Sequence, residues 1–493
     1  MAPAEQSEGT VRLDPRPDFD LPDLDRTAGL RTGLAREELA TLTYWDTDDR
    51  RLARRSLVAL CEAAGDASVW TVTAPEGTYR YESTSVDTVD PEVNGLLTAV
   101  VRGRELCIVA RLERRRLTET LHEGSGRAVA QIELDELSVP NNGGVTERSR
   151  ELVARFDRSV EADVRDAMVA RLTAAGAVES ARAPAYVRLL AVQDGSAPEL
   201  VAPSVGKKAT IADLVTSALV DGVERVIAGD RVARDGRDAE GVHQMRVGLR
   251  RIRSVLHIYA GAVDTAWAEA LRAEISPVMR ALGAVRDVDV LRVRLVATLA
   301  ALDDGDRSLG GEHDLLARFD SDYERCRARL LGVLGGDYVA FVDRLVAAAA
   351  APKFTASAAR IAADFAPSRI KKRWRELDEQ VDALGDHPSD DALHELRIAT
   401  KRVRYAVEAI VPAVRDAEPL AERLALLQDC LGDLHDSAVA TQWLRSQVAS
   451  AAGPEGYLLG LLVAREAEHR GQLRAQWPDL WDKAGKKKLR SWM

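Results

Sequence analysis

Hydrophobic and polar positions alternate along several stretches of the first 200 residues. Short alternating runs cover residues 38–47, 68–75 and 79–83, and longer runs cover residues 106–123 and 127–139. A period of two places every second side chain on the same face of an extended strand. These runs therefore predict β-strands, several of them long.

Turn signals separate the strands that this pattern predicts. GSGR at residues 124–127 lies between the two longest runs and predicts a hairpin, and PNNGG at residues 140–144 predicts a further turn. Residues 157–193 have a helical pattern instead. Antiparallel strands joined by tight turns favour a β-barrel or a curved sheet, so we expect an α+β unit here.

The hydrophobic period changes to 3.6 residues after about residue 210. Residues 198–210, PELVAPSVGKKAT, contain two prolines, a glycine and a serine and are the best candidate for a linker. We therefore expect a first domain at residues 1–197. An all-helical domain at residues 211–493 would follow, built as one or two antiparallel bundles.

Charge is distributed unevenly between these two parts. The chain has a net charge of −10, and residues 1–200 account for all of it with 25 arginines, no lysine and 35 acidic residues. Residues 201–493 are neutral overall and contain all ten lysines. An acidic average therefore does not exclude an anion-binding site, because such a site needs only local clustering of cations.

The helical part contains an internal repeat. HQMRVGLRRIRSVL at residues 243–256 recurs as HELRIATKRVRYAV at 394–407, and ALGAVRDVDVL at 281–291 recurs as CLGDLHDSAVA at 430–440. Two blocks in the same order at nearly equal spacing indicate a duplication. We therefore expect two similar halves, about residues 211–350 and 351–493.

The first block of each repeat places one histidine and several cations on one helix face. At about 100° per residue, offsets of 0, 3, 7 and 10 fall within an arc of roughly 80°. Like charges four residues apart repel each other by a few tenths of a kcal/mol. Either acidic neighbours such as Asp287, Asp289 and Asp436 or a bound polyanion must offset this repulsion.

A base-free phosphate chain fits the stripes best. Arginine offers phosphate oxygens a two-pronged donor, and lysine offers a point charge. Few aromatic residues lie near the stripes, which argues against single-stranded nucleic acid. We predict that polyphosphate is bound by His243, Arg246, Arg250, Arg251, Arg253, Arg286, Lys371, Lys372, Arg373, Arg375, His394, Arg397, Lys401, Arg402, Arg404 and His435.

The repeated blocks closely resemble the CHAD family, the conserved histidine α-helical domain, over about residues 207–493. The resemblance implies two four-helix bundles around a pseudo-two-fold axis with a basic central pore. It also implies inorganic polyphosphate as the ligand and association with polyphosphate granules. The family has no established chemistry of its own.

Residues 1–200 resemble a CYTH domain through TYWDTDDRRLARRSL at 43–57 and VARLERRRLTETL at 109–121. That family implies an eight-stranded antiparallel tunnel that hydrolyses triphosphates with Mg²⁺ or Mn²⁺. Inward carboxylates would hold the metal, and inward lysines and arginines would hold the phosphates.

The family's active-site pattern is largely missing. Its N-terminal E-x-E-x-K signature aligns with Glu8, Thr10 and Arg12, and Thr73 replaces a lysine. VALCE at 58–62 replaces an arginine-rich segment, Val153 and Arg155 stand at acidic positions, and AYVRLL at 185–190 lacks its lysine. Cationic and acidic residues survive at five positions, Arg111, Arg115, Arg116, Asp135 and Glu136.

Three functions remain open at this point. The first is a polyphosphate-binding, granule-associated protein whose CYTH-like domain is inactive, with no catalytic residue, metal or cofactor and with a residual anion site at Arg111, Arg115 and Arg116. The second is an inorganic triphosphatase that uses Mg²⁺ or Mn²⁺. The third is a nucleic-acid scaffold, which the acidic composition disfavours.

Location in the cell can also be judged from the sequence. No apolar run reaches the roughly 20 residues of a membrane span, and the N-terminus has no pattern of a secretory leader. The four cysteines are scattered, which is typical of a reduced compartment. We expect a cytoplasmic protein without a membrane partner.

Overall fold

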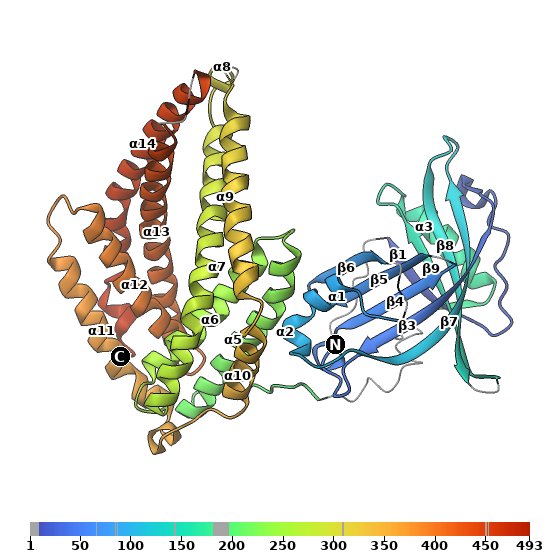
Figure 1. Ribbon diagram of the computed structural model, residues 1–493, viewed down its shortest axis with the longest axis horizontal. Coiled ribbons are helices and arrows are strands. Elements are labelled where there is room, and N and C mark those ends of the chain that lie inside the picture. Colours follow the sequence, from blue (N-terminus) through green and yellow to red (C-terminus); the bar gives the residue numbers. More distant parts are fainter. Residues whose placement is uncertain are drawn as a thin grey trace. The chain divides into compact units, whose positions relative to one another are not determined.

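The alternating runs near the N-terminus form a ten-stranded antiparallel sheet in the computed structural model (Figure 1). The structure describes residues 9–493 except 66, 84, 86, 142–143, 181–196, 308–309, 449–450 and 452. Residues 1–199 and 200–493 form two compact units. The strands are β1 (Thr10–Pro15), β2 (Arg31–Thr32), β3 (Arg36–Asp46), β4 (Val58–Ala64), β5 (Ala67–Ala74), β6 (Gly77–Ser83), β7 (Cys107–His122), β8 (Ala128–Asn141), β9 (Gly144–Phe156) and β10 (Ala177–Glu179).

The sheet has the strand order β10-β1-β9-β8-β7-β3-β4-β5-β6, and β2 pairs with β7. The predicted hairpin at residues 124–127 is confirmed, because it joins β7 to β8 and Gly126 has the positive φ of +84° that its turn requires. The antiparallel sheet is therefore confirmed. Its closure into a tunnel is not, because no strand pairing among the described residues joins β6 to β10. The three residues of β10 offer few backbone groups for such a closure.

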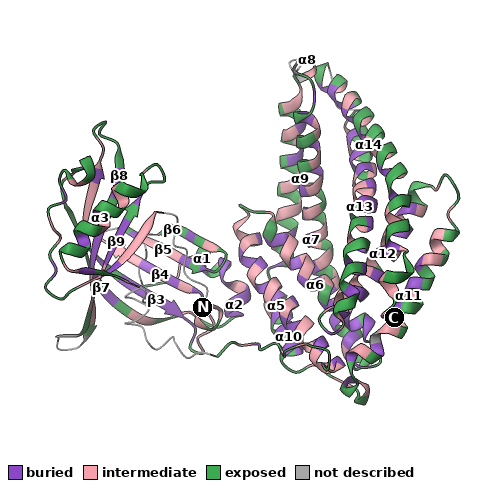
Figure 2. Cartoon of the chain, turned by 180° about the vertical axis from the view of Figure 1, so that it is seen from behind, coloured by how far each residue is buried: buried purple, intermediate pink, exposed green. Residues whose placement is uncertain are grey.

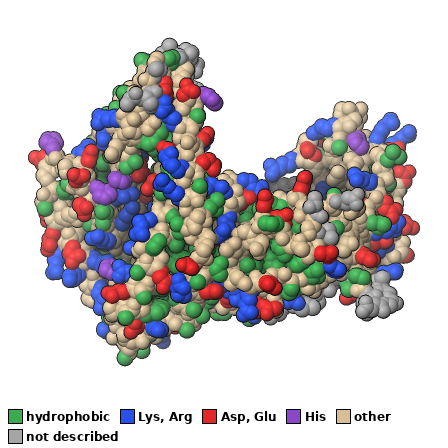
Figure 3. Space-filling model, viewed as in Figure 1, with side chains coloured by type: hydrophobic (Ala, Val, Ile, Leu, Met, Phe, Trp, Pro, Cys, Tyr) green, Lys and Arg blue, Asp and Glu red, His purple; other side chains and the backbone are tan. Residues whose placement is uncertain are grey.

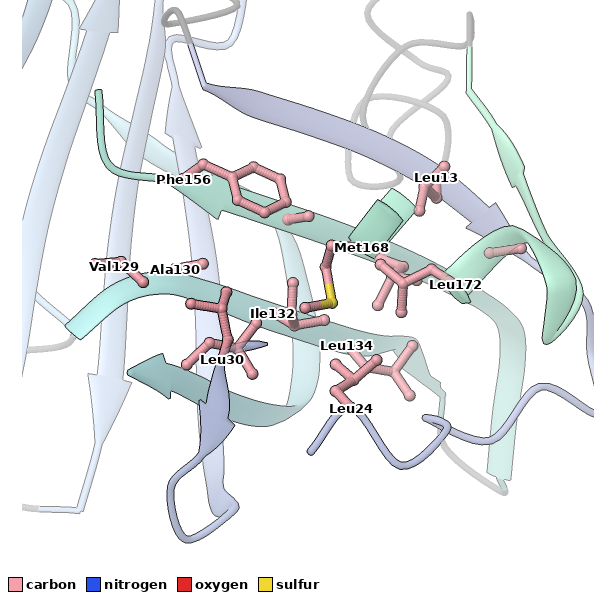
Figure 4. Packing of buried hydrophobic residues seen from close by; sticks show 14 of the residues in the cluster. Leu13, Leu24, Leu30, Val129, Ala130, Ile132, Leu134, Phe156, Met168 and Leu172 are labelled. Atoms are coloured by element: carbon pink, nitrogen blue, oxygen red, sulfur yellow. The ribbon is translucent and has the colours of Figure 1, made fainter. Parts of the chain in front are cut away.

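Helix α3 (Ala162–Ala174) covers one face of this sheet. Its Met168 and Leu172 are buried against Leu13 of β1 and Ile132 of β8 (Figure 4). Each such side chain contributes roughly 1.5–3 kcal/mol when it leaves water. The 3-10 helices η1 (Thr27–Gly29) and η2 (Ala53–Arg55) and the short helices α1 (Pro91–Leu96) and α2 (Thr98–Val101) complete the described part of this unit.

The second unit is helical, as the 3.6-residue period predicted. Polar residues cap several helices. The Thr210 hydroxyl accepts a hydrogen bond from the Asp213 amide at the start of α5, for example. The helices of the first repeat are α5 (Ile211–Asp235), α6 (Glu240–Ile258), α7 (Thr265–Ala300), α8 (Asp304–Arg307), α9 (Glu312–Val333) and α10 (Tyr338–Ala350). Those of the second are α11 (Ala362–Asp382), α12 (Asp390–Ile410), α13 (Glu418–Gln447) and α14 (Pro454–Ala484), with the 3-10 helices η4 (Ala356–Ala359), η5 (Arg415–Ala417) and η7 (Lys487–Arg490).

The long helices of the two repeats correspond in order, with α5, α6, α7 and α9 matching α11, α12, α13 and α14. Equivalent helices meet, because α6 packs against α12 and α7 packs against α13. Buried residues follow the inner sides of these helices, and exposed residues follow the outer sides (Figure 2). This arrangement brings the two repeated blocks together inside the helical unit.

Small residues hold α6 close to α5. A Cβ atom on Gly248 of α6 would lie only 2.4 Å from the carbonyl oxygen of Gly222 on α5. The two backbones therefore touch, and no larger side chain fits between them. This contact fixes the direction in which α6 presents its opposite, cationic face. None of the described helices is long and apolar enough to cross a membrane.

Candidate functional site

The stripes of α6 and α12 face a common cavity of about 410 Å³. Helices α7 and α13 form its other walls, so all four repeated blocks contribute to it. In Figure 3, blue and purple side chains gather in a hollow of the helical unit. We call this space the cationic cavity. Its lining residues are His243, Arg246, Val247, Arg250, Arg286, Asp287, Val290, Leu291, Arg294, Arg397, Lys401, His435, Asp436 and Val439.

Five cations of the cationic cavity have no carboxylate within 4.0 Å in the described part of the chain. These five are Arg246, Arg250, Arg286, Arg397 and Lys401. The Nε atom of Arg397 is buried without a hydrogen-bond partner among the described residues. Buried donors are normally satisfied, so the cavity holds donors that a ligand can use.

Burial, together with crowding among these cations, lowers the pKa of two of them. Burial, together with Arg397 and Arg250, lowers the pKa of Lys401 to about 8. Burial and the neighbouring Arg250 and Arg286 also lower the pKa of Arg246. The charged forms are therefore destabilised, and an anion placed among them would reverse that effect.

Each stripe begins with a histidine, His243 on α6 and His394 on α12. His394 and His435 are hydrogen-bonded, with 3.1 Å between their Nδ1 atoms. Burial and the nearby Arg397 lower the pKa of His435 to about 4, so its ring is neutral at pH 7. Burial also lowers the pKa of His243. One ring of the His394–His435 pair therefore donates a proton and the other accepts it.

Two carboxylates, Asp287 and Asp436, line the cationic cavity and reduce its positive charge without pairing with its cations. Burial raises the pKa of Asp436. Arg294 is held differently, because its Nε atom lies 2.9 Å from Glu466 on α14 and its Nη1 atom contacts Asp433 on α13. Arg294 therefore links three helices beside the cavity and contributes a sixth cation to its lining.

Arg294 is not among the polyphosphate-binding residues predicted from the sequence. It follows Asp287 by seven residues, which places both on the same face of α7, and that spacing is a signal that could have found it.

Several predicted residues lie outside the cationic cavity. Arg251 forms a 2.8 Å ion pair with Asp221, and Arg404 forms a 2.6 Å ion pair with Glu408. Neither is a free cation. The structure also places outside this cavity the remaining predicted residues Arg253, Lys371, Lys372, Arg373, Arg375, His394 and Arg402.

The three arginines of the predicted N-terminal anion site are not brought together. Arg116 alternates in position with Arg111 and Arg115 along β7, so its side chain leaves the opposite face of the sheet. Arg111 is paired with Asp87 at 2.8 Å. Arg115 is paired with both Glu37 and Glu136. Each therefore already has a carboxylate partner.

The opposite face carries a network of ion pairs where the resemblance implies metal and phosphate ligands. Arg116 binds Asp135 through two hydrogen bonds of 2.6 and 2.7 Å. The other pairs of this network are Arg12–Glu151, Arg114–Glu62, Arg116–Glu133 and Arg155–Glu133. Each carboxylate of this network is therefore paired with at least one arginine and is less available to a divalent cation.

Metal ligation can be tested on the residues present. No group of three or more His, Cys, Asp or Glu side chains with the geometry of a metal site occurs in the described ranges. Glu8 and the segment 185–190, two of the positions that the resemblance compares, lie outside the described residues. The described donor set does not fit a resident Mg²⁺ or Mn²⁺ ion.

The chain is similar to several known proteins. An uncharacterized protein of Mycobacterium tuberculosis is 29% identical over 476 residues, covering 88% of this chain and 87% of the relative. The CHAD domain of the plant Ricinus communis is 24% identical, covering 58% of this chain and 95% of that one, with a TM-score of 0.43. A Hippeastrum protein described as a putative adenylyl cyclase with a dominant triphosphatase activity is 15% identical, covering 36% of this chain and 93% of that one, with a TM-score of 0.23.

The CHAD domain family matches residues 217–445, which include both repeated blocks and all four helices that line the cationic cavity. An antiparallel sheet unit precedes this match in the chain. The helical unit therefore contains the segment that matches the CHAD domain family.

Proposed function

We propose that the helical unit binds inorganic polyphosphate in the cationic cavity. The observation that carries this proposal is the convergence of five cations without ion pairs, Arg246, Arg250, Arg286, Arg397 and Lys401, from three helices. Their burial and mutual repulsion, which together lower the pKa of Lys401, cost stability unless an anion is bound. Polyphosphate presents one negative charge or more on each phosphate unit and would relieve it.

The lining of the cavity favours a phosphate chain over nucleic acid. No described residue that lines it is aromatic, so bases have no platform on which to stack. Its volume of about 410 Å³ lies within the range of small-ligand sites, about 300–1,000 Å³. Arginine and lysine donors without base-reading groups suit a ligand made of phosphate alone.

We further propose that binding localises this protein to polyphosphate granules and that the N-terminal unit is not a triphosphatase. Support for the second point is the pairing of Asp135, Glu133 and Glu62 with Arg116 and Arg114. A carboxylate held by a guanidinium is a poor ligand for Mg²⁺ or Mn²⁺, since the two cations compete for the same oxygens.

The binding proposal is tested with fluorescently labelled polyphosphate and two variants that remove the same charge. The cavity variant carries Arg246→Gln, Arg250→Gln, Arg397→Gln and Lys401→Gln. The control carries Arg251→Gln, Lys371→Gln, Lys372→Gln and Arg375→Gln, which lie outside the cavity. Each charged hydrogen bond contributes about 1.5–3 kcal/mol, so the cavity variant should lose at least about 100-fold in affinity and the control far less.

Equal losses of affinity in the two variants would show that general surface charge, and not the cavity, binds polyphosphate. Circular dichroism checks that both variants are folded. Competition with single-stranded DNA at fixed salt tests the nucleic-acid alternative, which predicts displacement at similar phosphate concentrations.

The second proposal is tested by phosphate release from tripolyphosphate with Mn²⁺ or Mg²⁺. Release at the rate of the metal-only blank is expected. Release that depends on the protein and is abolished by Asp135→Ala would establish the triphosphatase instead.

A further inference from the structure

A second cavity of about 560 Å³ lies beside the cationic cavity. The two share only Val247 and Arg250 among their described lining residues. Helices α5, α6, α12 and α13 supply most of its walls. Arg250 therefore stands at the boundary between two separate spaces.

The charged residues that line the two cavities differ. The second cavity is lined by the carboxylates Asp221, Glu408, Glu418 and Glu422, and we call it the acidic cavity. Its lining cations are Arg250 and Arg251. Asp221 is paired with Arg251 and Glu408 with Arg404, whereas Glu418 and Glu422 have no ion pair among the described residues. A chain of phosphates that passed from the cationic to the acidic cavity would meet carboxylates of its own sign.

A side-chain stack closes the boundary. The guanidinium of Arg250 lies over the ring of Tyr405, 4.7 Å from its centroid, and so connects α6 to α12. The Tyr405 hydroxyl is buried and has no hydrogen-bond partner among the described residues. The ring lines the acidic cavity, and the guanidinium of Arg250, which lines both cavities, lies over it.

We infer that the cationic cavity binds the end of a linear phosphate chain and not its middle. This inference rests on the proposed polyphosphate binding. A chain that enters the cavity would end at the Arg250–Tyr405 stack, because Glu418 and Glu422 beyond it would repel further phosphates. A terminal phosphate also carries three non-bridging oxygens and close to two negative charges at neutral pH, whereas an internal unit has two such oxygens and one charge. A terminal phosphate is thus the better partner for the arginine and lysine donors of the cationic cavity.

The unmodified protein is titrated with linear polyphosphate of one length whose two ends are free or are capped as alkyl phosphoramidates. Capping should weaken binding about tenfold or more, because the terminal oxygens lose their charged hydrogen bonds. Linear tripolyphosphate should likewise bind more tightly than cyclic trimetaphosphate, which has no end. At saturation, the number of proteins bound to each free-ended chain should not change with chain length.

Capped chains that bind as well as free ones, with more proteins bound on longer chains, would overturn the inference while leaving the proposed function intact. If no form of the chain binds, the proposed function itself fails. The two results are therefore distinguishable.

A variant tests whether the Arg250–Tyr405 stack causes the preference for free chain ends. Tyr405→Ala combined with Glu418→Gln and Glu422→Gln opens the boundary and removes two of the carboxylates beyond it, so the preference for free ends should fall toward none. Tyr405→Phe keeps the ring and loses only a hydroxyl without a partner, so the preference should remain. A preference unchanged in the open variant would contradict the inference.

Discussion

Arg246 rests on the backbone of α7 at Gly283. A Cβ atom on this glycine would lie 2.8 Å from the Nη1 atom of Arg246, closer than real contacts allow. The equivalent pair in the second repeat is looser, because a Cβ atom on Gly432 would lie 3.8 Å from the Nε atom of Arg397. The repeated glycine therefore has different consequences in the two halves, which offers a matched comparison.

Replacing Gly283 with alanine should weaken polyphosphate binding without destabilising the protein. The group that must move is the far end of the Arg246 side chain, while alanine favours the helix by up to about 1 kcal/mol. We expect the dissociation constant to rise about fivefold and the midpoint of thermal unfolding to stay the same or to rise. Gly432→Ala is the control, since ordinary contact with Arg397 leaves affinity unchanged. Equal effects on affinity would show that the position of Arg246 does not matter.

Polyphosphate affinity should fall as the pH rises through about 8. The pKa of Lys401 is lowered to about 8 by burial and by Arg397, Arg250 and Arg246, while Asp436 acts in the opposite direction. Lys401 is therefore charged below this pH and neutral above it. Titration calorimetry at pH 8.5 in buffers of different ionisation enthalpy should show proton uptake on binding, because the anion stabilises the charged form.

Lys401→Arg provides the control for this pH dependence. Arginine stays charged over the range, so proton uptake should disappear and affinity should become flat between pH 7 and 9. Uptake that persists in this variant would assign the titration to another group.

Replacing His435 with arginine should strengthen binding at the expense of stability. His435 occupies the position equivalent to Arg286, and its pKa of about 4 leaves it neutral at pH 7. A cation there adds a phosphate contact, but it also repels Arg397 and loses the hydrogen bond to His394. We expect several-fold tighter binding and a lower unfolding temperature. His313→Arg adds the same charge at an exposed position of α9 and should change neither property appreciably.

Removing Arg116 should destabilise the N-terminal unit. The buried Asp135 would lose the guanidinium that pairs with it, and the buried Glu133 would keep only its pair with Arg155, so the loss should be about 3 kcal/mol or more. Arg111 belongs to the same strand, but its pair with Asp87 is exposed and should contribute less than about 1 kcal/mol. Urea denaturation of Arg116→Ala and Arg111→Ala measures the difference. Similar losses would show that the network is not what stabilises this face.

The strands, the helices and the duplication could be predicted from local pattern. Alternation along β7 and β8 and the 3.6-residue period of α6 and α12 depend on neighbours in sequence, so the local chain determines them. The absence of lysine before Lys207 likewise indicated an altered phosphate site in the first unit. Closure of the sheet depends on strands far apart in the chain, and it was predicted but is not seen among the described residues.

The sequence by itself determined that each repeat carries a cationic stripe, because helical spacing alone places His243, Arg246 and Arg250 on one face. Only the tertiary structure decided that the two stripes share one cavity, since α6 and α12 are separated by more than 130 residues and meet through packing. It also decided which charges are free. Arg250 faces the cavity and a tyrosine from the other repeat, whereas its neighbour Arg251 reaches Asp221 on α5. Charge pairing depends on distances of a few ångströms between distant segments, and linear spacing contains no such information.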